Sequence, residues 1–349
     1  MTRCLITGAA GFIAHHTFEH LLATTDWDLI GIDSLSYAGD PHRFENMKGF
    51  DADRVTIVWH DLNAPLVGHP TSDRIGPVDH VINMAAGSHV DRSIDEPVPF
   101  FTNNVAIALN VLEWVRLVCP DAKVVQVSTD EVYGPAATGQ SHAEWDTILP
   151  SNPYAGSKAA QEAAAFAYWR TYGLRLAITN TMNNFGERQH TEKFVPMAIR
   201  DLVAGKPVTA HGRPVYLDGN RGSTQPLRWE PSSRVWLHAR NHADAMRWLL
   251  DTQDFPTYGG EVTRPLRYNV AGEREIGVDG IVGMIADTLG VEPRIEWVDY
   301  HSSRPGHDLR YSLDGSKITA AGWVPPVGLD ESFERTVKWY VDHPEWLYG

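Results

Sequence analysis

The sequence predicts an α/β protein with a Rossmann-like, doubly wound parallel sheet and a smaller, mixed C-terminal lobe that binds substrate. Two observations predict this fold. Short apolar runs alternate with longer helical patterns through the first half of the 349 residues. A glycine turn follows the first run directly. Such alternation is typical of a parallel sheet with helices on both faces.

Six apolar runs account for the expected strands of the main domain. They lie near residues 3–7, 29–33, 55–60, 80–85, 123–128 and 174–180. Helical patterns lie near residues 12–24, 98–118 and 153–172. The sequence therefore predicts a Rossmann domain over residues 1–180.

The chain changes in texture after about residue 181. Segments become shorter, and Pro, Gly and Arg become more frequent, which predicts the smaller lobe over residues 181–349. Segments near 234–250 and 267–272 are expected to return to the main domain, with strand patterns at 234–239 and 267–270. Asp218-Gly219 is flanked by extended-type residues, so an inserted, hairpin-like segment is expected at about 211–233.

Composition limits the classes of function. The formal net charge is −14, which disfavours general binding to nucleic acid or to an anionic membrane. Hydrophobic residues make up 43% of the chain, as in ordinary globular proteins, and no window resembles a membrane span. Cys4 and Cys119 are expected to be reduced core thiols of a cytoplasmic protein.

The histidines do not indicate a metal site. There are 16 of them, and His15-His16 and the pair His89 and Asp91 are the strongest candidates for ligands. None of these pairs has the spacing of a known metal motif. We therefore expect no bound metal.

The glycine turn is typical of a dinucleotide-binding site. Gly8 and Gly11 follow the first strand and open the first helix, where backbone N–H groups can meet a pyrophosphate. Asp33 ends the second strand and can accept both ribose hydroxyls, which favours NAD over NADP. Asp61 and Leu62 end the third strand and could border the adenine.

A second group of residues can move protons. Thr129, Asp130 and Glu131 follow a strand, and two adjacent carboxyl groups in a pocket should titrate apart to give one acid and one base. Tyr154 and Lys158 lie on one face of a helix, where the ammonium should lower the phenol's pKa and make it a base. Ser88 follows another strand and can touch nicotinamide or sugar.

These strings resemble the extended short-chain dehydrogenase/reductase superfamily and, within it, the dTDP-glucose 4,6-dehydratase family. The resemblance covers nearly the whole chain. The shared strings are residues 7–13, 33–39, 88–94, 127–134, 154–158, 183–186, 192–193, 268–270 and 304–310. The adjacent Asp130 and Glu131 are the most specific part, because related epimerases have small hydroxyl residues there and decarboxylases keep the glutamate alone.

The resemblance also implies site residues. For NAD they are Gly8, Gly11, Phe12, Ile13, Asp33, Ser34, Leu35, Ser36, Asp61, Leu62, Ala85, Ala86, Ser88, Asn103, Tyr154, Lys158 and Asn184. For the sugar nucleotide they are Ser88, Thr129, Asn183, Lys193, Phe194, Pro207, Thr209, Arg234, Asn269, Arg304, His307 and Asp308. Arginines suit the diphosphate, because they form forked, charge-assisted hydrogen bonds.

The implied reaction converts an NDP-glucose, with dTDP-glucose as the first candidate, to a 4-keto-6-deoxy sugar nucleotide. Tyr154, aided by Thr129, takes the O4 proton while C4 gives a hydride to NAD⁺. Glu131 then removes the C5 proton, Asp130 protonates the departing 6-hydroxyl, and the hydride returns to C6. The alternatives are a 4-epimerase or decarboxylase on the same scaffold, or a non-catalytic NAD-binding regulator.

Several residues depart from the family pattern. Gly87 replaces a glutamate, Asn103 a threonine and Thr209 an aromatic residue, and Arg228 competes with Arg234 for one arginine position. These changes leave the nucleotide base open. The resemblance further implies a homodimer through helices 98–118 and 153–172, where Phe100, Phe101, Trp114 and Phe166 could form the interface or ordinary core.

Overall fold

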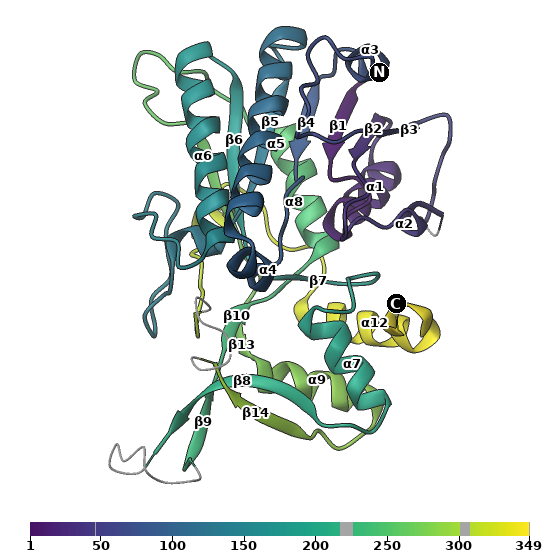
Figure 1. Ribbon diagram of the computed structural model, residues 1–349, viewed down its shortest axis with the longest axis vertical. Coiled ribbons are helices and arrows are strands. Elements are labelled where there is room, and N and C mark those ends of the chain that lie inside the picture. The colour runs from purple at the N-terminus through teal and green to yellow at the C-terminus, as the bar shows by residue number, and fades with distance from the viewer. Residues whose placement is uncertain (46, 217–225, 301–307, 349) are drawn as a thin grey trace.

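The computed structural model of the chain describes residues 1–45, 47–216, 226–300 and 308–348. Its centre is a seven-stranded parallel sheet in the order β12-β6-β5-β4-β1-β2-β3 (Figure 1). The strands are β1 (Arg3–Thr7), β2 (Asp28–Asp33), β3 (Val55–Trp59), β4 (His80–Asn83), β5 (Lys123–Thr129), β6 (Arg175–Thr181) and β12 (Leu266–Val270). The predicted fold class is confirmed.

Strand order places a crevice at the middle of the sheet. From β1 the chain builds outward through β2 to β3, and then returns to lay β4 on the other side of β1. The connections therefore diverge between β1 and β4. In an open α/β sheet this switch point is where ligands bind, beyond the carboxyl ends of the strands.

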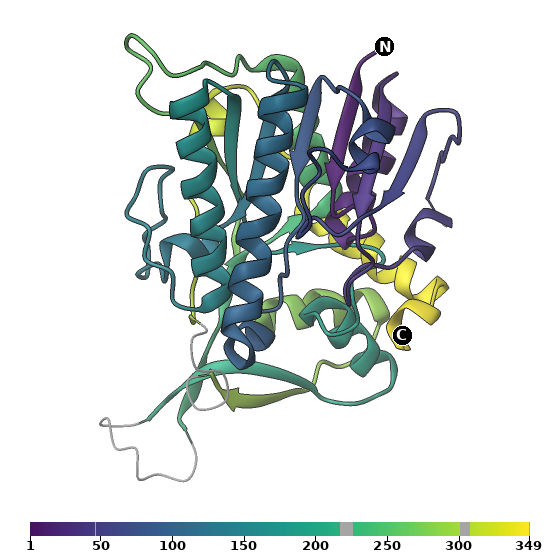
Figure 2. The ribbon, with the colours of Figure 1, turned by 45° about the horizontal axis from the view of Figure 1, so that its top comes forward.

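Alternating side chains of the strands feed two cores. Cys4 and Ile6 of β1 face the core beneath α1 (Phe12–Thr24) and α8 (Ala239–Thr252). Leu5 faces the opposite core, beneath α5 (Pro97–Val118) and α6 (Pro153–Tyr172). Figure 2 shows α5 and α6 side by side in front of the sheet. This period of two is what a strand covered on both faces requires.

The smaller lobe has its own sheet and core. β8 (Val208–Val215) pairs with β14 (Ile295–Asp299) in parallel and with β9 (Arg228–Pro231) antiparallel. Apolar side chains of α7 (Phe194–Val203), α9 (Val278–Leu289) and α12 (Leu329–Asp342) form its core. The expected hairpin-like pairing is therefore present as β8 and β9, whereas its Asp218-Gly219 turn lies outside the described residues.

The two segments expected to return to the main sheet behave differently. Residues 267–270 do return, because β12 pairs with β6 at the edge of the sheet. Residues 234–239 do not. They form β10 (Ser233–Val235) and β11 (Leu237–His238), which pair with β13 (Glu275–Gly277) and β7 (Asn184–Phe185). The following helix, α8, then packs against α1.

Short elements complete the described chain. They are α2 (His42–Glu45), α3 (Pro70–Ile75), α4 (Val90–Asp95), the 3₁₀ helix η1 (Asp130–Tyr133), α11 (Ser316–Ala320) and α13 (Glu345–Tyr348). Cys4 and Cys119 are free and buried, as expected. Among the described helices, none combines the length and apolar character needed to cross a membrane.

Candidate active site

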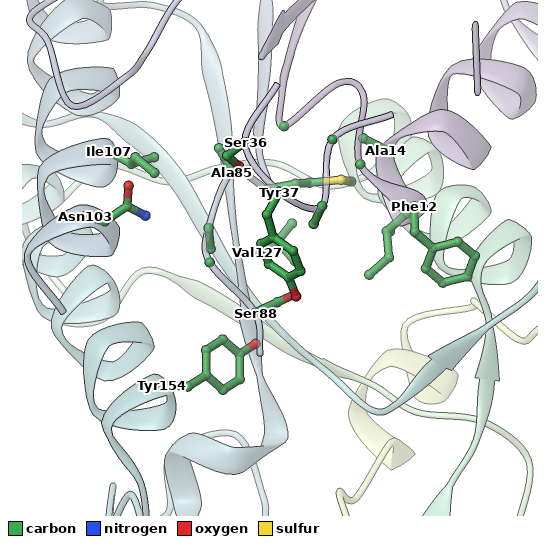
Figure 3. Close-up of a pocket in the computed structure, with 18 of the residues that line it drawn as sticks. Phe12, Ala14, Ser36, Tyr37, Ala85, Ser88, Asn103, Ile107, Val127 and Tyr154 are labelled. Carbon is green, nitrogen blue, oxygen red and sulfur yellow. The ribbon is translucent and has the colours of Figure 1, made fainter. Parts of the chain in front are cut away.

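A cavity of about 590 Å³ lies at the carboxyl ends of the central strands (Figure 3). It is lined by the turn after β1 and by residues that follow β2, β3, β4, β5 and β6. Helices α5 and α6 contribute further lining residues, including Asn103, Ile107, Tyr154 and Lys158. The cavity therefore lies at the switch point of the sheet, where the strand order predicts a ligand site.

The glycine turn after β1 leaves room for a ligand to approach the backbone. Gly8 has a φ of +71°, and a Cβ there would lie 3.1 Å from the Cα of Ala85. A Cβ on Gly11, which caps α1, would lie 2.8 Å from the carbonyl oxygen of Gly8. A side chain at either position would press on backbone, so the turn fits a pyrophosphate held by N–H groups.

Asp33 borders this turn at the end of β2. Its carboxylate accepts hydrogen bonds from the backbone N–H groups of Ala10 at 2.9 Å and Leu35 at 2.7 Å. Burial raises the pKa of Asp33, whereas these backbone donors lower it. Each carboxylate oxygen can accept a further donor, so Asp33 fits a ribose diol.

Sequence reasoning missed Arg43, which stabilises the cofactor half of the cavity. This buried side chain donates from Nη1 to the carbonyl oxygens of Ala10 at 2.6 Å and Ala38 at 2.8 Å. It thereby ties the glycine turn to the segment that follows Asp33. Its Nε also donates to the carbonyl oxygen of Arg188 at 3.2 Å. No local pattern could have found it, because Ala10 and Arg188 lie far from it in the sequence.

The carboxyl pair lies at the start of η1. The Thr129 hydroxyl donates to Asp130 Oδ1 at 2.8 Å, while Oδ2 is buried and has no hydrogen-bond partner among the described residues. Glu131 Oε2 accepts from Asn152 Nδ2 at 3.0 Å and from the Tyr311 hydroxyl at 3.5 Å. Both carboxyl groups line the cavity.

The two carboxyl groups differ in their electrostatic surroundings. Burial and then the charge of Glu131 raise the pKa of Asp130 to about 7. Burial raises the pKa of Glu131, which the Asn152 amide and the charge of Arg234 counteract. Asp130 is therefore suited to hold a proton near neutral pH, and the two carboxyl groups have different hydrogen-bond partners, as an acid and a base require.

Tyr154 and Lys158 lie in the same cavity, but the ammonium does not act on the phenol as predicted. Lys158 Nζ donates to the carbonyl oxygen of Val127 at 2.8 Å and to Gln161 Oε1 at 2.5 Å. Burial and the charge of Glu131 raise the pKa of Tyr154 above its usual range, against a hydrogen bond with Thr129. The predicted lowering of this pKa is wrong for the protein without ligands.

Most of the residues predicted for the cofactor, and four of those predicted for substrate, line the cavity. Besides those above, they are Phe12, Ile13, Ser34, Ser36, Asp61, Leu62, Ala85, Ala86, Ser88, Asn103, Asn183, Asn184 and Lys193. Seven of the described residues do not line it, namely Leu35, Phe194, Pro207, Thr209, Arg234, Asn269 and Asp308. Arg304 and His307 lie outside the described residues.

Asn269 is not placed where a substrate would reach it. The residue is completely buried, and its Nδ2 donates to the carbonyl oxygens of His142 at 2.8 Å and Asp314 at 3.2 Å. Its amide therefore joins three segments of the protein interior. This corrects the expectation that it contacts the sugar nucleotide.

Arg234 and Asp308 lie beside the carboxyl pair without lining the cavity. The guanidinium of Arg234 lies 4.5 Å from the ring centroid of Tyr311 and donates to the carbonyl oxygen of Asp308 at 2.9 Å. Its charge lowers the pKa of both Asp130 and Glu131. The segment after residue 307 therefore reaches the reacting end of the site.

Gly87 has little space for the side chain that the family carries there. A Cβ at this position would lie 3.0 Å from the ring of Phe100, which also lines the cavity. The Gly87 N–H donates to Asn104 Oδ1 at 2.7 Å. The ring of Phe100 thus occupies the space that a side chain at position 87 would need.

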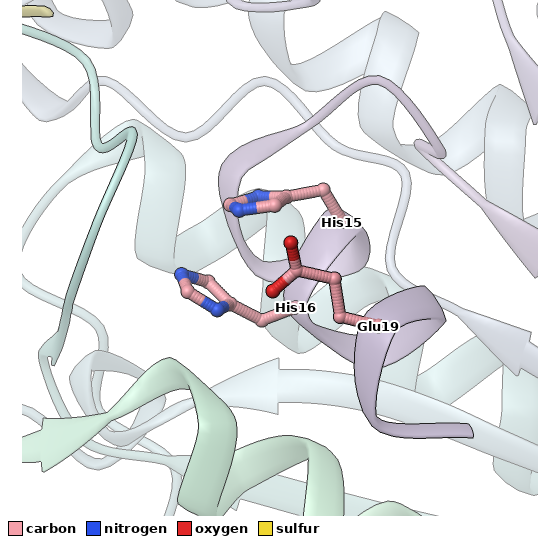
Figure 4. A group of neighbouring side chains, drawn as sticks. All are labelled: His15, His16 and Glu19. Atoms are coloured by element: carbon pink, nitrogen blue, oxygen red, sulfur yellow. The ribbon is translucent and has the colours of Figure 1, made fainter. Parts of the chain in front are cut away.

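Three side chains of α1 come close enough to hold a cation. Potential ligand atoms of His15, His16 and Glu19 all lie within 4.8 Å of one another (Figure 4). However, Arg188 Nη1 lies 3.3 Å from His15 Nε2 and 3.1 Å from Glu19 Oε1. The guanidinium supplies the positive charge that a metal ion would bring, so this cluster does not fit a cation.

Comparisons with known proteins agree with the geometry. The family model described as GDP-mannose 4,6 dehydratase matches residues 5–336. A dTDP-glucose 4,6-dehydratase of Xanthomonas campestris is 33% identical, over 100% of this chain and 96% of the relative.

Two solved structures are similar along almost the whole chain. A dTDP-glucose 4,6-dehydratase from Streptomyces venezuelae with NAD bound has a TM-score of 0.82 and 33% identity, covering 99% of this chain and 98% of that one. A UDP-glucose 4-epimerase from Thermus thermophilus in complex with NAD has a TM-score of 0.81 and 27% identity, covering 97% and 99%. Since the family model spans nearly all of its residues, this protein belongs to the GDP-mannose 4,6 dehydratase family.

Proposed function

We propose that this protein is an NAD-dependent 4,6-dehydratase that converts an NDP-glucose, with dTDP-glucose as the first candidate, to its 4-keto-6-deoxy product. The observation that carries the proposal is the presence of Asp130, Glu131 and Tyr154 in one cavity beside the glycine turn. Epimerisation at C4 needs no such acid–base couple. Dehydration needs one group to take a proton from C5 and another to give one to the leaving hydroxyl.

The cofactor half of the cavity suits NAD. Gly8, Gly11 and the N-terminus of α1 would hold the pyrophosphate, and Asp33 the adenosine ribose. Asp61, Leu62 and Asn103 would border the adenine, and Tyr154 and Lys158 the nicotinamide side. Bound NAD⁺ would accept the C4 hydride and return it to C6.

The protein's own residues would carry the protons. Tyr154, hydrogen-bonded to Thr129, takes the O4 proton as the C4–O4 bond becomes a carbonyl. The ketone acidifies C5–H, whose proton passes to Glu131. Asp130 gives its proton to the 6-hydroxyl as the C6–O bond breaks, and one water leaves. Glu131 finally returns a proton to C5, and the proton that Tyr154 took from O4 replaces the one that Asp130 gave up. The sugar has then lost one water in total, and the residues are back in their starting state.

Tyr154 needs help to ionise, because burial and Glu131 raise its pKa. A cation close to a phenol lowers its pKa. The oxidised nicotinamide would carry such a charge, whereas Lys158 Nζ is held by Val127 and Gln161. We therefore expect the phenol to become a base in the enzyme with cofactor bound.

The substrate half of the site takes residues from both parts of the chain. Ser88, Asn183 and Lys193 line the cavity, and Arg234 and Asp308 stand next to the carboxyl pair. The chain would divide into an NAD-binding domain over residues 1–180, joined by the returning helix α8 and strand β12, and a substrate lobe from the rest of residues 181–349. The similarity to dTDP-glucose dehydratases favours a thymine base, and the departures at Gly87 and Thr209 leave other bases to be tested.

A homodimer in the cytoplasm completes the proposal. Helices α5 and α6 pack together and present Val98, Phe101 and Leu109, which are exposed in the monomer. Trp114, which the sequence left open between interface and core, is completely buried and donates to Ser72 Oγ at 2.8 Å. The interface would therefore use Phe101 rather than Trp114.

The carboxyl pair provides the test of the function. Wild-type protein should be purified with NAD bound and should convert dTDP-glucose to a product that has lost water. Asp130→Asn and Glu131→Gln should each reduce this turnover by about 10²–10⁴-fold, the usual effect of losing a positioned proton carrier. Full activity in the doubly amidated protein would exclude the assignment.

The same assay separates the alternatives. An epimerase, favoured by the structural similarity to UDP-glucose 4-epimerase, would give a product of unchanged mass. A decarboxylase acting on an NDP-uronate would give a product that has lost carbon dioxide. Tight NAD binding without turnover of any NDP-glucose would favour a non-catalytic role.

A further inference from the structure

We propose that Asn152 is a positioning residue that makes Glu131, rather than Asp130, the base of the proposed dehydration. The inference rests on the proposed function and concerns how two adjacent carboxyl groups come to have different roles. Asn152 was not among the predicted site residues. It directly precedes Pro153, the first residue of α6.

The Asn152 side chain connects the two catalytic segments. Its Oδ1 accepts from the backbone N–H of Ala155 at 2.8 Å and so caps α6, the helix of Tyr154 and Lys158. Its Nδ2 donates to Glu131 Oε2 at 3.0 Å. The residue is 7% exposed, so both bonds form away from bulk water. One amide thus fixes Glu131 relative to the phenol.

Only an amide can fill both tasks at this position. Serine, threonine and aspartate also cap helices well, because each offers an acceptor oxygen. Asparagine adds an NH₂ group that can donate at the same time, whereas an ionised aspartate can only accept. Serine can donate a proton but is shorter and would have to use its one hydroxyl group in both directions. The need for a cap alone does not explain Asn152.

The donor breaks the symmetry of the carboxyl pair. Asp130 accepts one hydrogen bond, from Thr129, and its Oδ2 has no hydrogen-bond partner among the described residues. Glu131 receives the Asn152 amide, which stabilises its ionised form. A single proton shared by the pair therefore resides on Asp130. With the proton on Asp130, this residue can protonate the C6 hydroxyl, and Glu131 can take the proton from C5.

Other charges around Glu131 come from several elements. Asp130 of η1 and Asp308 disfavour its ionised form, whereas Arg234 of β10 and Lys193, which precedes α7, favour it. The hydroxyl of Tyr311 lies 3.5 Å from Oε2, and Tyr154 of α6 is also coupled to it electrostatically. Arg234 and Lys193 act on Glu131 through their charges, whereas Asn152 touches it directly. Removing the amide should therefore change the two carboxyl groups unequally.

Two variants keep the helix cap and change only the contact with Glu131. Asn152→Ser retains a capping oxygen and loses the donor to Glu131. Asn152→Asp retains the capping oxygen and the length of the side chain. It replaces the NH₂ group that donates to Glu131 with an oxygen that can only accept. Asn152→Ala loses both the cap and the donor, so its difference from Asn152→Ser reports the cost of the cap. The three proteins are compared with wild type for thermal midpoint and for kcat and KM with dTDP-glucose as a function of pH.

We expect Asn152→Ser to keep the wild-type thermal midpoint within a few degrees and to lose roughly 10–100-fold in kcat. The acidic limb of its pH profile should move to higher pH, because Glu131 binds a proton more readily without the amide. Asn152→Asp should move this limb further. In deuterated water, uptake of solvent deuterium at C5 should slow in step with kcat.

The result that would overturn the inference is an acidic limb at the wild-type pH in both Asn152→Ser and Asn152→Asp. If Asn152→Ser proves unstable, Asn152→Asp alone decides, since it keeps the capping oxygen. A wild-type protein that does not dehydrate dTDP-glucose or any other NDP-glucose would instead exclude the proposed function. The two failures are therefore distinguishable.

Discussion

At the scale of single residues, Asp130 illustrates how surroundings set a role. Its carboxyl group is 3% exposed, and it accepts one hydrogen bond from Thr129. Burial and the charge of Glu131 raise its pKa to about 7. A carboxyl group that remains protonated near neutral pH can serve as a general acid. The same raised pKa also makes the stability of the folded protein depend on pH.

Asp130→Asn should become more stable than wild type as pH rises. In the unfolded chain the Asp130 carboxyl has its ordinary pKa of 3.8, and in the folded protein it has a pKa of about 7. The folded state therefore binds the proton more tightly, and wild-type stability is lost as pH rises between these values. The amide does not titrate. Its advantage should grow by roughly 2–3 kcal/mol between pH 5 and pH 8.

Urea unfolding at the two pH values measures this advantage. Asp26→Asn, at an exposed position, serves as the control and should show no such growth. An advantage of Asp130→Asn that is equal at pH 5 and pH 8 would contradict a raised pKa. The experiment needs no cofactor or substrate, so it tests the electrostatics of the pair independently of turnover.

The sequence predicted those site residues that belong to a motif. It missed those whose role depends on contacts between distant segments. The strings that contain Asp33, Asp130 and Tyr154 led directly to cavity residues. Arg43 bonds to two distant segments that no local pattern brings together. The i, i+4 spacing of Tyr154 and Lys158 wrongly predicted that the ammonium lowers the pKa of the phenol. The ammonium instead donates to the carbonyl oxygen of Val127. Asn152 could have been found as a helix cap before proline, but not as a partner of Glu131.

At the scale of elements, the glycine turn links β1 to the cofactor. Gly11→Ala would place a Cβ 2.8 Å from the Gly8 carbonyl oxygen, so the turn must open. We expect on the order of a tenfold or greater loss of NAD affinity, measured by calorimetry on the stripped protein. Gly283→Ala is the control, because its Cβ meets nothing within 4 Å on helix α9.

Gly11→Ala and Gly283→Ala should also change the free energy of unfolding in opposite directions. Alanine at position 283 should stabilise the protein by about 0.5–1 kcal/mol, the usual difference from glycine inside a helix. Its affinity for NAD should equal that of wild type. Wild-type NAD affinity in Gly11→Ala would show that the turn does not hold the pyrophosphate.

The inserted segment after β8 is the element least constrained by the family pattern. β8 and β9 pair antiparallel in the smaller lobe, and residues 211–233 include Arg213, Arg221 and Arg228. We expect deletion of residues 214–228 to change the KM or the base preference among dTDP-, UDP-, CDP- and GDP-hexoses. Unchanged kinetics with all four nucleotides would exclude a role for this segment in substrate binding.

At the scale of the whole molecule, the sequence predicted the main sheet well and the smaller lobe poorly. Each run from residues 3–7 to 174–180 became a strand, because apolar strands alternate with long helices there. Residues 234–239 look equally strand-like but pair within the smaller lobe. A short apolar run specifies that a strand forms, whereas its partner depends on how distant segments pack.

Assembly offers a prediction at the same scale. Phe101 of α5 is 39% exposed and lies against Gly156 of α6, on the surface expected to pair two copies. Phe101→Glu should convert a dimer to a monomer in sedimentation velocity, because it buries a charge at an apolar interface. Val324→Glu, at another exposed apolar position, should leave the dimer intact. A monomeric wild-type protein would exclude the proposed interface.

The account depends on the claim that a single cavity oxidises C4, removes water from C5 and C6, and returns the same hydride to C6. The most direct measurement is turnover of dTDP-glucose that carries deuterium at C4, followed by product mass and NMR. We predict a product that has lost one water and carries the deuterium on its C6 methyl group. A product of unchanged mass, or a dehydrated product without deuterium at C6, would contradict it.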